Sequence, residues 1–171
     1  MSGDVLARLS ALDCRGFVDA LGDVFERSPW VAEAAWARRP FASEAALHGA
    51  MMAAVRGAPV DVQVAFLRGH PELAGAEARA GTMTALSTVE QRSGGFDTLD
   101  RGELAELQRL NAAYAGRHGF PFIIQVQAHS KAQIFGALRE RLARPTAVER
   151  EAALAQVEAI TRGRLQRRLA A

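Results

Sequence analysis

The chain has 171 residues and a formal net charge of +2 at pH 7, with 49% hydrophobic but only 6% aromatic residues. This composition favours close-packed helices over a sheet, and the small charge excludes a strong basic field. Because Cys14 is the only cysteine and Lys131 the only lysine, an internal disulfide and a multi-cysteine metal site are excluded, and a Schiff-base enzyme would have one candidate residue.

The sequence carries no signal for a membrane or for export. The N-terminus, Met1-Ser2-Gly3-Asp4, lacks the basic and apolar regions of a signal peptide, and no apolar run approaches ~18 residues. We therefore expect a soluble, cytoplasmic protein with no membrane partner.

The first 68 residues predict four helices. Asp13 and Ser43 are suited to cap the first and third, and Ser28-Pro29 is typical of the cap and first residue of the second. His48 lies inside the third helix, where a lone histidine is usually packed or solvated. The predicted ranges are 13–26, 28–38, 43–57 and 59–68.

The stretch Gly69-His70-Pro71 interrupts this helical pattern. Proline fixes its own φ, lacks an N–H and pushes the preceding residue out of the α region, so His70 is expected at a stiff helix-ending corner. A histidine held there is a candidate for proton transfer near neutral pH. Taken alone, the corner favours the simpler interpretation of a capping histidine in a tight turn.

Residues 75–99 are small, polar and glycine-rich. Within them, Ser87 followed by Glu90 has the spacing of a capping box, in which the two side chains bond each other's backbone N–H. That interpretation places Glu90 and Gln91 in the first turn of a short helix ending at Gly94. It is purely structural and, without other evidence, it is favoured.

The remaining chain predicts three helices and one extended run. A helix over 100–118 has apolar residues at three- and four-residue steps, and Gly119 is placed to end it. The run Phe120–Val126 is too short for a helix and has no partner strand, so its backbone groups need partners from helix ends, side chains or a ligand. With helices over 130–143 and 146–170, we predict an all-α protein: one compact domain over residues 1–171, of about eight helices, with an extended segment at 120–126.

Three stretches carry a resemblance to a known family: His70-Pro71, Ser87-x-x-Glu90-Gln91 and Phe120-Pro121-Phe122-Ile123. Together with Asn111-x-x-Tyr114, their order and spacing resemble the 2-oxo-4-hydroxy-4-carboxy-5-ureidoimidazoline (OHCU) decarboxylases over nearly the whole chain. The resemblance implies an all-helical fold, a homodimer, and neither metal nor organic cofactor. The implied reaction is loss of CO2 from OHCU to give (S)-allantoin in urate degradation.

The resemblance also assigns roles to residues. His70, Glu90 and Arg164 match the catalytic residues of the family, although Gly163 replaces the leucine usual before that arginine. Gln125 stands where a cysteine is common, and His118 where an aromatic residue is common. The positions that match substrate-contacting groups are Pro71, Ser87, Gln91, Phe122, Ile123, Ile124, Gln125 and Val126.

These residue types suit the implied chemistry. OHCU has a C=N beside the carbon that bears the carboxylate, so the substrate can accept the electron pair that decarboxylation leaves. His70 can move a proton near neutral pH, Glu90 can fix its tautomer, and Arg164 offers a planar fork for a carboxylate.

Arg162 is the alternative to Arg164. Two positions on a helix differ by about 200°, so the two side chains cannot face the same pocket. Because Val157, Ile160 and residue 164 follow one another at helical steps, we predict that Arg164 points inward, toward an anion such as a substrate carboxylate or Glu90, and that Arg162 points to solvent. The alternative for Arg164 is a structural ion pair within or between chains.

Three functions other than decarboxylation can be weighed against the same residues. A metal-dependent hydrolase would have to use histidines that lack the i, i+4 spacing and the carboxylates of a metal site. Nucleic-acid binding would rest on arginines of the last helix, whose basic face lacks interleaved aromatic residues. A non-catalytic helical ligand-binding protein with the same pocket is the stronger alternative, but it would not require His70, Glu90 and an arginine together.

Overall fold

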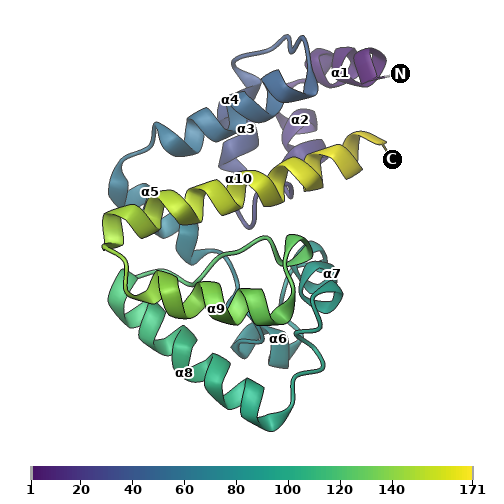
Figure 1. Ribbon diagram of the computed structural model, residues 1–171. Coiled ribbons are helices and arrows are strands. Elements are labelled where there is room, and N and C mark those ends of the chain that lie inside the picture. Colours follow the sequence, from purple (N-terminus) through teal and green to yellow (C-terminus); the bar gives the residue numbers. More distant parts are fainter. Residues whose placement is uncertain (1, 171) are drawn as a thin grey trace. The chain divides into compact units, whose positions relative to one another are not determined.

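The computed structural model describes residues 2–170, which form ten α-helices and one 3-10 turn and contain no β-strand (Figure 1). The predicted all-α class is confirmed. Two helices beyond the predicted eight are α1 and the five-residue α6. The elements are α1 (Ser2–Ala11), α2 (Cys14–Leu21), α3 (Trp30–Trp36), α4 (Glu44–Arg56), α5 (Val60–Arg68), α6 (Ala76–Ala80), α7 (Ala85–Ser93), α8 (Arg101–His118), η1 (Val126–Ala128), α9 (Lys131–Leu142) and α10 (Thr146–Ala170).

Local capping signals account for several helix starts. Asp13 Oδ1 accepts a hydrogen bond from Gly16 N at 2.8 Å, and Ser43 Oγ accepts one from Ala46 N at 3.0 Å, as predicted. The prediction for Ser28 is wrong, because its hydroxyl donates to the carbonyl of Glu26 and α3 starts at Trp30. The first predicted helix is also too long, since α2 ends at Leu21 and Gly22 follows as its cap.

The chain divides into two compact units. Unit 1 contains the described residues up to Gln63 and those from Glu158 onward, and unit 2 contains Val64–Val157. The expectation of one domain over residues 1–171 stays a prediction.

In unit 1, α3 packs against both α2 and α4 around a core that includes a histidine. His48 is buried, its ring is stacked 6.3 Å from that of Phe25, and its Nε2 lies 2.9 Å from Thr161 Oγ1. Burial, followed by the nearby charge of Arg162, lowers the pKa of His48 below its usual value. His48 is therefore a packed core histidine, the first of the two roles expected for it.

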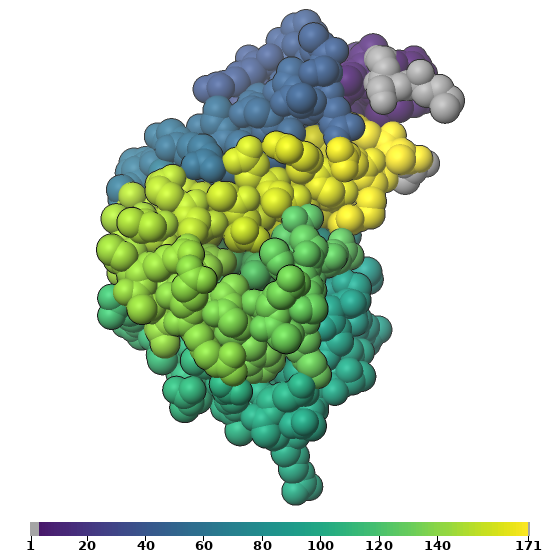
Figure 2. Space-filling model, in the orientation of Figure 1, coloured from purple at the N-terminus to yellow at the C-terminus, as the bar shows by residue number. Residues whose placement is uncertain are grey.

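In unit 2, α8 and α9 pack side by side. The inner face of α9 carries the buried residues Ile134, Leu138 and Arg141, whereas Arg139 is exposed. Green atoms of this part of the chain lie on the face shown in Figure 2. Tyr114 of α8 is fully buried against the rings of Phe120 and Phe122. The core of this unit thus lies directly beneath the predicted extended run.

Within residues 2–170, none of the helices alone has both the length and the apolar composition of a membrane span; only α4 and α5 taken together meet these two criteria.

Candidate active site

The His70 corner has the predicted form. Helix α5 ends at Arg68, the N–H of His70 donates to the carbonyl of Leu67 at 3.1 Å, and no helix passes through Pro71. His70 is 9% exposed, and its imidazole meets the ring of Phe66 edge-on at 5.3 Å. Three hydrogen bonds to the backbone of the residues that follow make this corner stiff.

The residues that follow His70 are held by side chains from two other helices. Gln91 of α7 accepts a hydrogen bond from Ala74 N at 3.0 Å and donates one to the carbonyl of Glu72 at 3.2 Å. Asn111 of α8 donates to the carbonyl of Leu73 at 3.0 Å. Ala74 has a φ of +46°, a conformation that costs energy in a residue with a Cβ. The three hydrogen bonds offset this cost and keep the loop in one conformation.

Gln91 was predicted as a substrate contact on the basis of the resemblance, and the structure adds a second role. Its amide joins α7 to the loop after His70, so the helix that carries Glu90 and the corner that carries His70 are fixed to each other. The sequence placed Asn111 in the motif Asn111-x-x-Tyr114 but did not identify it as a partner of the loop after His70.

The capping box predicted at Ser87 and Glu90 is wrong. Helix α7 begins three residues earlier, and its N-cap is Thr84, whose hydroxyl accepts from Ser87 N at 3.3 Å. Ser87 therefore lies inside the first turn with its side chain buried, and Glu90 is half-buried one turn later. A cap no longer explains why these two residue types occur here.

The segment after Gly119 is extended, as predicted, and side chains supply its backbone partners. Gln156 Oε1 accepts from Gln125 N at 2.9 Å, and Arg141 Nη1 donates to the carbonyl of Ile123 at 3.0 Å. Gln125 is half-buried, and its four neighbours are buried: Phe122, Ile123, Ile124 and Val126. Neither Arg141 nor Gln156 was identified from the sequence.

Helix α7 also packs against η1. This turn begins at Val126, so the extended run ends at Gln125, one residue before the predicted end. A Cβ added to Gly94 would lie 2.0 Å from Val126 Cγ1 and 3.2 Å from Phe96 Cδ2, so only glycine fits at this position. The corner after His70, helix α7 and residues 120–126 thus form one connected part of unit 2.

The close approach at Gly94 gives a testable prediction. Gly94→Ala should lower the free energy of unfolding by ~1–3 kcal/mol, the usual cost of overpacking, and should lower activity by moving α7 against Val126. Adding Val126→Ala should recover much of both losses. Gly136→Ala is the matched control, because nothing lies within 4 Å of its added Cβ and it should be neutral or slightly stabilising. Equal effects of the two glycine variants in chemical denaturation would contradict the assigned contact.

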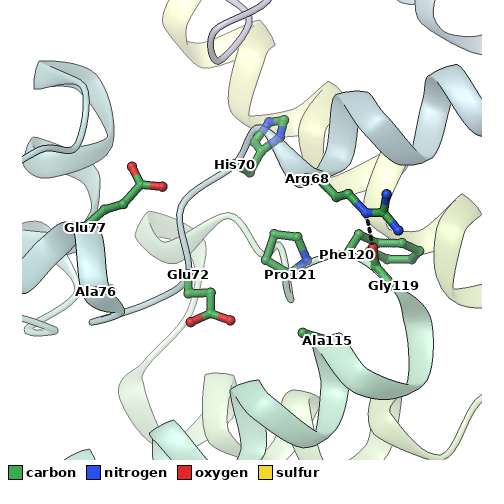
Figure 3. Close-up of a pocket in the computed structure, with 9 residues that line it drawn as sticks. All are labelled: Arg68, His70, Glu72, Ala76, Glu77, Ala115, Gly119, Phe120 and Pro121. Carbon is green, nitrogen blue, oxygen red and sulfur yellow. Dashed lines mark hydrogen bonds between the residues drawn. The ribbon is translucent and has the colours of Figure 1, made fainter.

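A pocket of about 290 Å³ includes the His70 side chain (Figure 3). Glu72, Glu77 and Arg68 also line it, and Arg68 Nε donates to the carbonyl of Gly119 at 2.6 Å. A second pocket, of about 410 Å³, includes Gln91. The predicted site residues of unit 2 that line neither pocket are Pro71, Ser87, Glu90, Phe122, Ile123, Ile124, Gln125 and Val126.

Arg164 and Arg162 differ as predicted. The side chain of Arg164 is 4% exposed and that of Arg162 is 60% exposed, the latter pairing with Glu158 at 3.5 Å. Arg164 belongs to unit 1, where its Nη1 lies 2.9 Å from Oε2 of the buried Glu26. The partner seen here is therefore a carboxylate of the protein, which is the structural alternative considered for this residue.

Across residues 2–170, no three side chains of histidine, cysteine, aspartate or glutamate come together in an arrangement that could hold a metal ion.

Comparison with known proteins agrees with the arrangement of these elements. A family model described as OHCU decarboxylase matches residues 10–166. The chain is 39% identical to a 2-oxo-4-hydroxy-4-carboxy-5-ureidoimidazoline decarboxylase of Amia calva, over 94% of this chain and 92% of that protein. It is also 39% identical to a protein of the same name from Haloferax volcanii, over 95% of each chain.

A solved structure shares the fold. It is the crystal structure of an (S)-allantoin synthase, with a TM-score of 0.74 and 27% identity, and the match covers 95% of this chain and 53% of that chain. The family model matches residues 10–166, and two relatives are 39% identical over at least 94% of this chain. The chain therefore belongs to the OHCU decarboxylase family.

Proposed function

We propose that this protein is a carboxy-lyase that converts OHCU to (S)-allantoin and CO2 in urate degradation, without a metal or organic cofactor. The observation that carries the proposal is the fixed His70 corner, which Gln91 ties to the helix bearing Ser87 and Glu90 in a member of this family. We further propose that the protein is a cytoplasmic homodimer.

The substrate provides the electron sink for this reaction. As the C–CO2 bond breaks, its electron pair forms a C=C bond to the neighbouring carbon of the C=N group, and the C=N pair moves onto nitrogen, which takes up a proton. The hydroxyl of the decarboxylated carbon then loses its proton and becomes a carbonyl, and one proton is delivered to a single face of the former C=N carbon. The protein has to orient the carboxylate out of the ring plane and to place the proton donor, which are effects of position rather than of a cofactor.

We assign these tasks to groups already described. His70 transfers the proton, and Glu90 fixes the imidazole tautomer and hydrogen-bonds the substrate. Ser87, Gln91, Pro71 and the main chain of Phe122–Val126 contact the urea-like groups of the ring. Arg164 binds the carboxylate, and its bond to Glu26 orients the guanidinium, which has five N–H donors.

The decisive experiment is to add purified protein to freshly generated OHCU and to follow the formation of (S)-allantoin by circular dichroism. We expect stereoselective turnover that survives exhaustive chelation and dialysis. Binding of OHCU without turnover would instead favour the alternative, a non-catalytic ligand-binding protein. Loss of activity on chelation that zinc or manganese restores would favour a metal enzyme.

Glu90 can be tested separately from folding. Because Thr84 caps α7, Glu90→Gln should leave the melting curve close to that of the parent, while turnover falls severely through loss of the carboxylate. Glu106→Gln is a matched control, since Glu106 pairs with Arg139 at the surface of the same unit. A Glu90→Gln variant with nearly full activity would exclude the catalytic role.

A further inference from the structure

A buried polar network lies beneath the extended segment of unit 2. Glu149, in the first turn of α10, is fully buried and accepts hydrogen bonds at its Oε1 from Tyr114 Oη at 2.5 Å and from Arg141 Nε at 2.6 Å. The three side chains come from α8, α9 and α10, and all are at least nine-tenths buried. None of them is used in the proposed reaction.

A buried ion pair is an expensive structure, because the loss of hydration can exceed the attraction between the charges, and apolar residues of similar volume often stabilise a protein as well. The groups that this network binds therefore indicate its role. The Nη1 of Arg141 donates to the carbonyl of Ile123 at 3.0 Å, and its guanidinium lies over the ring of Phe122 at 4.6 Å. One end of the network is thus the backbone of the segment assigned to substrate contact.

The positions of the anchored groups determine which edge of the segment remains for a ligand. In an extended chain, main-chain groups alternate between two edges with a period of two. Ile123 and Gln125 are two residues apart, so the carbonyl of Ile123 and the N–H of Gln125 share one edge. Arg141 and Gln156 bind them there. The main-chain groups of Phe122 and Ile124 then point to the opposite edge.

We propose that Arg141, held in place by Glu149 and Tyr114, is a positioning residue for the reaction: by fixing the carbonyl of Ile123 it sets the main-chain edge at Phe122 and Ile124 against which the substrate lies. This inference rests on the proposed function. It identifies Phe122 and Ile124 as the residues whose main chain contacts the substrate, and Ile123 and Gln125 as the residues whose main chain the protein anchors. Arg141 itself touches no substrate.

Titratable side chains from α8 and from the residue after α9's cap face the network. Burial, together with the bond to Glu149, raises the pKa of Tyr114, so this phenol stays a neutral donor. The other titratable groups that face it are His118, whose ring centre is 4.5 Å from that of Tyr114, and Arg144, 3.9 Å from Glu149 Oε2. Burial lowers the pKa of His118, which favours the neutral imidazole.

Arg141→Lys is the sharpest test, because lysine keeps the charge but lacks the fork that binds Glu149 and Ile123 together. We expect kcat to fall at least ~10-fold through misplacement of the substrate, while the shape of the kcat–pH profile, which depends on His70, stays unchanged. Amide hydrogen exchange in residues 122–126, measured without substrate, should become faster. Arg139→Lys is the matched control on the same helix, since Arg139 is half exposed and pairs with Glu106.

A second variant covers the case in which Arg141→Lys does not fold. Tyr114→Phe removes one bond to Glu149 and keeps the ring, and we expect the same two changes at smaller size. Parental kcat and parental exchange in a folded variant of either residue would overturn the proposal. If the parent protein does not turn over OHCU but amide hydrogen exchange in residues 122–126 is still faster in the variants, the network holds the segment as proposed and the proposed reaction is wrong.

Discussion

Replacing His70 by asparagine or alanine should lower kcat at least ~10²-fold, the usual effect of losing a general acid–base group, and leave helical content and melting temperature nearly unchanged. The fold should survive because the corner is held through main-chain groups. Gln91 and Asn111 bind the backbone of residues 72–74.

His129→Asn is the matched control for this experiment, because His129 is exposed and precedes α9. Steady-state kinetics and thermal melting of both variants distinguish the two roles considered for His70. Near-parental turnover of the His70 variant would exclude proton transfer. A variant that unfolds, beside a stable His129 control, would mean that the histidine serves as a structural part of the corner.

Breaking the buried pair between Arg164 and Glu26 should have the largest effect on stability. Both side chains are almost fully buried, so Arg164→Met leaves a carboxylate without this counter-ion and should cost about 3–5 kcal/mol in chemical denaturation. The matched Arg162→Met removes only an exposed contact with Glu158 and should change stability by less than about 0.5 kcal/mol. Equal costs for the two variants would contradict the burial seen here.

The catalytic role of Arg164 needs a substitution that keeps the ion pair. Arg164→Lys retains the positive charge beside Glu26 but loses the planar fork, so we expect strongly impaired turnover in protein that is still folded at the assay temperature. Arg162→Lys should be close to silent. If activity and stability of Arg164→Lys fall together, or if sizing shows a changed oligomer, the residue acts through structure alone.

Local signals were the most informative part of the sequence. The caps at Asp13 and Ser43, the left-handed Gly119 and the His70-Pro71 corner all depend on contacts within three or four residues, which a single chain displays directly. Ser87 shows the limit of such signals. Thr84-x-x-Ser87 and Ser87-x-x-Glu90 overlap, and only the folded helix, in which Ser87 is buried, decides between them.

By itself, the sequence determined the all-α class, the extended segment after α8, the inward face of Arg164 and, through its resemblance, the family and the candidate residues His70 and Glu90. Only the tertiary structure decided what holds them. Glu26 and Arg164 are 138 residues apart, and Arg141 reaches the carbonyl of Ile123 across a turn and a helix. Periodicity reports which side chains point inward, but not which buried charges meet, because that choice depends on helices packed from distant parts of the chain.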